Sequence, residues 1–149
     1  MTEKGIVAVS TPLAPTPGGH YSQGIQYGGL LFVSGQLPIR PDGTHLRNAP
    51  FEAQCRQALA NLFGVLAGAG SSPVRVLKVT AYIAAAAHWA AFNAVFAEMF
   101  EEHRPARSVV PVRELHCGYL VEIDAIAGMR SVESSPVEMV GVQTPTRSV

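Results

Sequence analysis

Apolar residues recur at helical spacing in two segments of the chain. In residues 55–70 they follow one another at intervals of four and three, which forms one stripe along a helix; they are Cys55, Leu59, Leu62, Leu66 and Ala69. Gly68 and Gly70 are candidate stops for this helix. A second stripe, in residues 89–100, comprises Trp89, Phe92, Phe96 and Met99, with Val95 and Phe100 beside them. The spacing therefore predicts two amphipathic helices, the second without a side-chain N-cap because Ala84–Ala87 offers no acceptor.

Other segments show the alternation or the short apolar runs of β-strands. A short strand is expected at Ile6–Val9, and Gln26–Gln36 is typical of a strand pair or one bent strand. The run Leu30–Val33 within it indicates burial on both faces. In Val74–Ile83 the alternation places one set of apolar residues on a single face: Leu77, Val79, Ala81 and Ile83. The last predicted strands are approximately Ser108–Leu115 and Tyr119–Ala127.

These elements follow one another as β-β-α-β-α-β-β, preceded by the short first strand where it forms. The order predicts an α+β fold with two helices on one face of a mixed sheet. The opposite face must be solvated or covered by another subunit, and the apolar alternation in the last strand favours a partner. We expect one domain over residues 1–130. Residues 131–149 scatter Ser, Pro and Thr without periodicity and are expected to form a flexible C-terminal extension.

Composition and charge narrow the classes of function. The 149 residues suit one domain, and Lys+Arg equals Asp+Glu at 11 each, for a formal net charge of zero. A non-specific nucleic-acid binder needs a basic surface, which is present neither in total nor as a cluster. No apolar run is long enough to span a bilayer, and the N-terminus lacks the apolar core of a signal peptide. With two cysteines that form no disulfide framework, we expect a cytoplasmic protein that binds neither nucleic acid nor membrane.

Two charged residues near the end of the domain are candidates for chemistry. Arg107 follows Pro105-Ala106, which ends a helix and fixes the backbone, so its guanidinium can be aimed to bind a carboxylate through two parallel hydrogen bonds. Glu122 and Asp124 point to the same side of one strand. Neighbouring carboxylates on a partly buried surface raise each other's pKa, as a general acid or base requires. The alternatives are a surface salt bridge for Arg107 and a solvated strand face for Glu122.

Weaker signals accompany these two residues. In the polar segments Tyr21–Gly24 and Ser34–Gln36, Gly35 would let a ligand approach the backbone and Tyr21 could stack on a small planar substrate, although such tripeptides mostly form turns. Asn93 lies in the second helical stripe, where its amide either bonds to a neighbouring element or subunit or packs. The histidines and cysteines show no metal-ligand spacing, and there is no phosphate-binding loop or dinucleotide fingerprint. We therefore expect no metal and no cofactor.

The order and spacing of these motifs resemble the Rid family, also known as the YjgF or L-PSP endoribonuclease family. The resemblance covers roughly residues 20–128, and its most specific parts are Pro105-Ala106-Arg107-Ser108 and Val121–Ala127. It is carried also by Tyr21-Ser22-Gln23, Ser34–Pro38, the helix Gln57–Gly70, Val76–Thr80 and Phe92-Asn93. The resemblance implies a chorismate-mutase-like α+β fold. It also implies a homotrimer whose sheets pack into a central β-barrel, with clefts between the subunits.

The resemblance further implies a cofactor-independent deaminase. Such enzymes hydrolyse 2-aminoacrylate and related 2-imino acids to 2-keto acids and ammonia. By that analogy Arg107 clamps the substrate carboxylate, and Glu122 positions the attacking water with help from Ser34. Tyr21 packs on the substrate, the Gly35 backbone shapes the pocket floor, and Asn93 supports the site.

The chain departs from the family pattern close to these residues. Val109 stands where members often carry Cys, and His116 followed by Cys117 replaces a usual Pro after Leu115. These departures leave the substrate range open. The other hypotheses are a non-catalytic protein of the same fold that binds a small carboxylate, and an RNA-cleaving enzyme, which the zero net charge disfavours.

Overall fold

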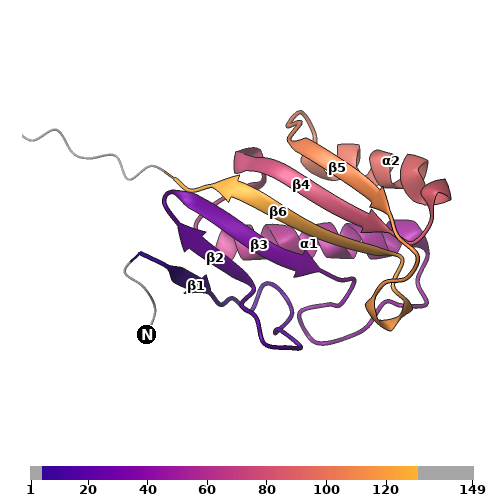
Figure 1. Cartoon of the computed structure of the whole chain (residues 1–149), viewed down its shortest axis with the longest axis horizontal. Coiled ribbons are helices and arrows are strands. Elements are labelled where there is room, and N and C mark those ends of the chain that lie inside the picture. The colour runs from indigo at the N-terminus through magenta and orange to yellow at the C-terminus, as the bar shows by residue number, and fades with distance from the viewer. Residues whose placement is uncertain (1–4, 131–149) are drawn as a thin grey trace, which may run out of the picture.

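A six-stranded mixed sheet forms the centre of the computed structural model, which describes residues 5–130 (Figure 1). The strands are β1 (Val7–Val9), β2 (Gly24–Tyr27), β3 (Leu30–Gln36), β4 (Val76–Ile83), β5 (Ala106–Pro111) and β6 (Val121–Gly128). They lie in the order β1-β2-β3-β6-β4-β5, and all neighbours are antiparallel except the parallel pair β4 and β5. Helices α1 (Phe51–Gly68) and α2 (Trp89–Phe100) cover one face, which confirms the predicted α+β fold (Figure 1).

Both helices serve as crossover connections between strands. α2 joins the parallel neighbours β4 and β5, whereas α1 joins β3 to β4, which β6 separates in the sheet. β6 is thus the last strand of the chain but lies in the middle of the sheet, antiparallel to both of its neighbours. A central strand is held by hydrogen-bond ladders on both sides. Residues of β6 therefore have a well-determined position, and Glu122 is one of them.

The apolar stripe of α1 builds the core as its spacing predicts. The buried residues of this helix include the predicted Cys55, Leu59, Leu62 and Leu66, but the helix begins earlier, at Phe51. Two amides are buried beside them, and a buried amide requires hydrogen-bond partners. Asn61 Nδ2 donates to the carbonyl oxygens of Leu37 at 2.9 Å and Ile39 at 2.7 Å, which holds the loop after β3 against α1.

The predicted apolar stripe of α2 is confirmed in the middle of the helix, but the prediction is wrong for its first residue, Trp89. Phe92, Val95, Phe96 and Phe100 are buried. Trp89 is 49% exposed, because the first residue of the helix lies beyond the core and packs beside the Arg107 guanidinium instead. The helix begins without a side-chain cap, as expected.

Two predictions about strand faces are corrected by the structure. Phe32, inside the apolar run of β3, is 42% exposed, so within one chain this strand is buried on one face only. Leu77 does not share the buried face of Val79, and it is 53% exposed. The cause is a register shift against β6 between Val76 and Lys78, which turns the extra residue outward.

The strand predicted at residues 108–115 begins and ends earlier in the chain than expected. β5 begins at Ala106 and ends at Pro111. Its partner β4 ends at Ile83, and the carbonyl oxygen of that residue accepts the Val112 N–H at 2.8 Å. Beyond this bond the ladder has no further residue of β4, so the chain leaves the sheet.

The face of the sheet opposite the helices is open within the described residues. Alternate residues of β6 are buried, starting with Val121, and those between them point to the other side. Glu122 and Asp124 therefore share the open face, as predicted. Within residues 5–130, no helix combines the length and the apolarity that a membrane span requires. The predicted extension 131–149 lies outside the described residues.

Candidate active site

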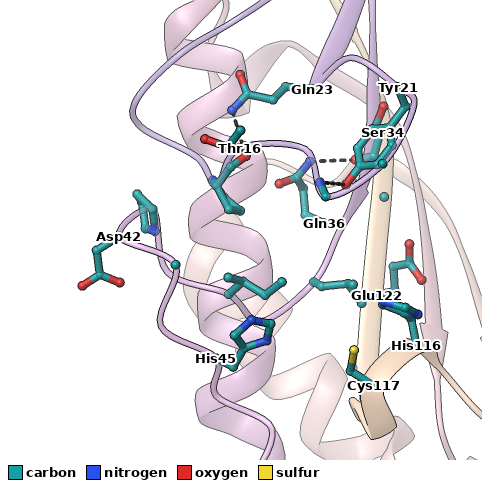
Figure 2. A pocket seen from close by; sticks show the side chains of 18 residues that line it. Thr16, Tyr21, Gln23, Ser34, Gln36, Asp42, His45, His116, Cys117 and Glu122 are labelled. Atoms are coloured by element: carbon teal, nitrogen blue, oxygen red, sulfur yellow. Dashed lines mark hydrogen bonds between the residues drawn. The ribbon is translucent and has the colours of Figure 1, made fainter.

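A cavity of about 860 Å³ lies beside the end of β3 and the start of β6. Three segments that are distant in sequence complete its wall: the arm 15–23, the loop 37–45 and the turn 116–117 (Figure 2). Four of the predicted site residues line it together: Tyr21, Ser34, Gly35 and Glu122. The structure therefore gathers most of the predicted site in one place.

The Glu122 carboxylate occupies space that the glycine opposite it leaves free. A Cβ atom on Gly35 would lie 2.2 Å from Glu122 Oε1 and 3.1 Å from its carboxyl carbon, so any side chain there would displace the carboxylate. The ladder between β3 and β6 shifts register between Val33 and Gln36, so this glycine lies in the irregular part of the strand. Gly35 thus leaves room for the Glu122 carboxylate at the cavity wall. The sequence had predicted only that this glycine leaves room for a ligand.

Burial and a neighbouring carboxyl both act on Glu122. Burial raises its pKa above the ordinary value, Asp124 raises it further, and His116 lowers it. Burial also raises the pKa of Asp124, against hydrogen bonds from Tyr82 and Thr80 that lower it. The Tyr82 hydroxyl donates to Asp124 Oδ2 at 3.4 Å. Of these two carboxyls, Glu122 lines the cavity, and its raised pKa makes it a stronger proton acceptor than an ordinary carboxylate.

The arm that carries Tyr21 is fastened by one buried amide. Gln23 is 4% exposed, and its Oε1 accepts the Thr11 N–H at 2.7 Å. Its Nε2 lies within hydrogen-bond distance of the carbonyl oxygens of Thr11, Ala14 and Pro15. These bonds join the two ends of the arm, Thr11–Pro15 and Gln23. The Tyr21 side chain is 53% exposed, and its hydroxyl accepts the Gly18 N–H at 3.3 Å.

Ser34 joins the arm to β3. Its Oγ donates to the Ser22 carbonyl oxygen at 2.6 Å, and its backbone N–H donates to the Gln23 carbonyl oxygen at 3.0 Å. The hydroxyl proton is committed to Ser22, so the oxygen lone pairs are left to accept a hydrogen bond from the cavity side. Ser34 therefore can hold a water molecule as an acceptor.

Sequence reasoning missed a second polar wall of the cavity. His45, His116 and Cys117 line it, together with Asp42 (Figure 2). His45 Nδ1 is hydrogen-bonded to the hydroxyl of the buried Tyr119, which ties the loop to the start of β6. The sequence contained one signal for this wall, because His116-Cys117 replaces an expected Pro just before the strand of Glu122.

Arg107 lies outside this cavity, with Asn93. Its Nη2 donates to Asn93 Oδ1 at 2.6 Å, and its guanidinium carbon lies 4.9 Å from the ring centroid of Phe96 and 5.6 Å from that of Trp89. These contacts place the side chain between β5 and α2, on the helix side of the sheet. Asn93 thus bonds to a neighbouring element, one of the two roles predicted for it.

The predicted site residues consequently form two groups within one chain. Arg107 and Asn93 lie at the β5 edge on the helix side, while Glu122 points to the open face of β6, with β4 between the two strands. The first group offers a cation, and the second offers a carboxyl of raised pKa and a hydroxyl oxygen that can accept a hydrogen bond. Within residues 5–130, no cluster of three His, Cys, Asp or Glu side chains is arranged to hold a metal ion.

Comparison with known proteins places this architecture in one family. The family described as Endoribonuclease L-PSP matches residues 11–129. A RutC family protein of Pyrococcus horikoshii is 42% identical over 119 residues, which cover 80% of this chain and 94% of that protein. The 2-iminobutanoate/2-iminopropanoate deaminase of Dermatophagoides farinae is 36% identical over 118 residues, covering 79% of this chain and 92% of its own length.

Solved structures agree with these relatives. E. coli TdcF with bound serine has a TM-score of 0.79 at 33% identity, and the match covers 83% of this chain and 99% of that one. The family match, over residues 11–129, includes every strand from β2 to β6 and both helices. The chain therefore belongs to the Endoribonuclease L-PSP family, the Rid family that its motifs resemble.

Proposed function

We propose that the protein is a cofactor-independent deaminase, which hydrolyses 2-aminoacrylate and related 2-enamine or 2-imine acids to 2-keto acids and ammonia. The observation that carries the proposal is the position of Glu122, a half-buried carboxyl of raised pKa in the wall of a cavity. The name of the Dermatophagoides farinae relative supports the substrate class.

Hydrolysis of an imine requires a water molecule at the C=N carbon and a group that takes its proton. Ionised Glu122 accepts this proton, and the Ser34 oxygen accepts a second hydrogen bond from the same water. The water oxygen bonds to carbon, the C–N bond then breaks, and nitrogen leaves as ammonia while the keto acid remains. Imines hydrolyse readily, so orientation and one activated water are sufficient.

Arg107 binds the substrate carboxylate in this mechanism. A guanidinium has five N–H donors, and Asn93 engages only the Nη2 group, so further donors remain for two parallel bonds to a carboxylate. The flanking aromatic rings limit water around the cation, which strengthens its attraction for an anion. Tyr21 packs on the substrate, and the Gly35 backbone forms the cavity floor.

The separation of Arg107 from Glu122 leads us to propose a homotrimer. Their strands are two spacings apart, roughly 10 Å, and the side chains point to opposite faces of the sheet. Arg107 of one subunit would therefore meet the Glu122 cavity of the next subunit. The open sheet faces would pack into a central barrel and bury exposed apolar residues such as Phe32 and Val110, which are 42% and 38% exposed in one chain.

An assay of ammonia release from a panel of 2-imino acids generated in situ tests this function. Wild type should exceed the buffer rate, and Arg107→Ala and Glu122→Gln should each lower kcat/KM by about 100-fold. Light scattering should show the same oligomer for all three proteins. Arg56→Ala is the matched control, because Arg56 pairs with Glu98 on the helix layer, and it should keep full activity. Equal turnover by Arg107→Ala and wild type would refute the assigned role.

A second candidate is a non-catalytic protein of the same fold that binds a small carboxylate. The structure of E. coli TdcF with bound serine favours it, because that protein holds a small carboxylate-bearing molecule. Calorimetric binding of amino or keto acids, lost in Arg107→Ala and without ammonia release from any imino acid, would support this reading. For the RNA-cleaving hypothesis, nuclease activity that disappears on further purification would rule it out. The cytoplasmic location and the domain bounds 1–130 stay predictions.

A further inference from the structure

The turn before β6 brings a second titratable side chain to the cavity of Glu122. It is a 3-10 turn, His116–Gly118, in which Cys117 has φ 56° and Gly118 has φ 70°. Two successive residues in the left-handed region reverse the chain sharply. His116 and Cys117 thereby reach the cavity wall beside Glu122 (Figure 2).

The residues after this turn are anchored on both sides, so the position of His116 is defined. Tyr119 is 1% exposed, and its hydroxyl is hydrogen-bonded to His45 Nδ1. The next backbone N–H, of Leu120, donates to Gln54 Oε1 of α1 at 3.0 Å. A side chain on such a supported frame can meet a substrate in a reproducible geometry.

Of the two histidines that line the cavity, His116 is the one with neither ring nitrogen hydrogen-bonded to a residue in the range 5–130. His45 is engaged by Tyr119, whereas the His116 side chain is exposed and makes no hydrogen bond to another residue in the range 5–130. An imidazole ring can both donate and accept a proton, as a group that acts in two successive proton transfers must.

The charges that act on this pair come from several elements. Burial and Asp124 raise the pKa of Glu122, while the positive charge of His116 lowers it. From β4, Tyr82 faces the same carboxyls, and its pKa is raised chiefly by Asp124 and also by Glu122. Around the cavity the other titratable residues are Tyr21, Asp42, His45 and Cys117.

We propose that His116 is the second proton-transfer group of this site and acts on the substrate nitrogen while Glu122 acts on water. This inference rests on the proposed deaminase function. It goes beyond the roles that the family resemblance implies, in which Glu122 handles water and no residue handles the nitrogen.

The proton transfers balance over one turnover. In the first step, protonated His116 gives its proton to the imine nitrogen as ionised Glu122 takes one from the attacking water, which leaves a carbinolamine. In the second step, Glu122 gives that proton to the amino nitrogen, the C–N bond breaks, and ammonia leaves with the bonding electrons. His116 takes the hydroxyl proton as the C=O bond forms, so both residues return to their starting states.

The pH profile of kcat separates this role from a structural one. Glu122 must be ionised and His116 protonated, so activity should fall at low pH and at high pH, giving a bell shape. His116→Asn should lower kcat by about 10-fold or more and abolish the fall at high pH, with little change in KM. The control His20→Asn, an exposed histidine outside the cavity, should keep the wild-type bell.

A second variant guards against misfolding. His116→Pro restores the residue usual in the family pattern, and it should fold and show the same loss of the high-pH fall. A wild-type bell in either folded variant would overturn the role of His116 while leaving the deaminase function intact. Absence of turnover by wild type over the whole panel would overturn the proposed function and this inference together.

Discussion

At the residue scale, the position of Glu122 depends on the missing side chain of Gly35. A Cβ atom there would lie 2.2 Å from Glu122 Oε1, the mobile end of a flexible side chain. Gly35→Ala should therefore fold with a nearly unchanged Tm, because the carboxylate can swing away. It should lower kcat/KM by about 100-fold, since a displacement of about 1 Å in a catalytic group costs that much. Thermal unfolding and the deaminase assay measure the two effects.

Gly18→Ala is the control for this substitution. Gly18 also lines the cavity, but no atom lies within 4 Å of its Cβ position. We expect it to change neither Tm nor activity by much. A fully active Gly35→Ala enzyme would show that the exact place of the Glu122 carboxylate does not matter.

The raised pKa of Glu122 also has a consequence for stability. Burial, and then Asp124, make the folded state hold the Glu122 proton more tightly than the unfolded chain does. Ionisation of Glu122 therefore has no effect on the free energy of unfolding below the ordinary carboxyl pKa. It lowers that free energy as the pH rises from the ordinary pKa through the raised pKa of the folded state. Glu122→Gln cannot ionise, so it should gain stability relative to wild type at about pH 8 but not at about pH 4.

Denaturant unfolding measures this difference. The protein concentrations must be equal, because assembly into oligomers also affects the apparent stability. Asp124→Asn provides a comparison that leaves Glu122 in place. It removes the charge that opposes ionisation, so the low-pH fall of kcat should move to lower pH. A stability difference between wild type and Glu122→Gln that is the same at both pH values would contradict the linkage.

At the element scale, regular periodicity was readable from the sequence and irregularity was not. The stripe of α1 and the alternation of β6 were predicted because each follows one helical or strand period throughout. Leu77 was assigned to the wrong face because a single register shift in β4 breaks the alternation without any local signal. The wall formed by His45 and His116 was missed for a related reason, since tertiary packing alone joins these segments.

The contact between α1 and the arm gives a prediction at this scale. A Cβ atom on Gly64 would lie 2.2 Å from the backbone oxygen of Leu13, which cannot move without the arm. Alanine in place of glycine favours a helix by about 1 kcal/mol, but overpacking costs about 1–3 kcal/mol. At 2.2 Å the clash is severe, so Gly64→Ala should lower the free energy of unfolding and displace the arm that carries Tyr21.

Urea unfolding measures the loss, and the protease sensitivity of residues 11–21 reports the displaced arm. Gly128→Ala is the control, because its nearest contact would be the Arg75 carbonyl oxygen at 3.8 Å. A gain of stability in Gly64→Ala would mean that the arm packs less tightly on α1 than the structure shows.

At the scale of the whole molecule, the sequence supplied the residues of the site but not their distribution. Arg107 and Glu122 were both selected from the motifs, yet strand alternation does not say that one points toward the helices and the other toward the open face. That distribution requires the full sheet order, with β6 inserted between β3 and β4. It is also the reason why, in the proposed function, a site that uses both residues would combine two copies of the chain.

Subunit mixing tests this composite site directly. In the proposed trimer, Arg107→Ala and Glu122→Gln should each retain only about a hundredth of the wild-type kcat/KM, because every cleft lacks one of the two groups. When the two proteins are unfolded together in equal amounts and refolded, each cleft draws its arginine and its glutamate from different subunits. Random assembly then gives about a quarter of clefts with both native residues, so about a quarter of wild-type activity should return. A site contained within one chain would recover no activity on mixing, since each chain would still carry its own defect.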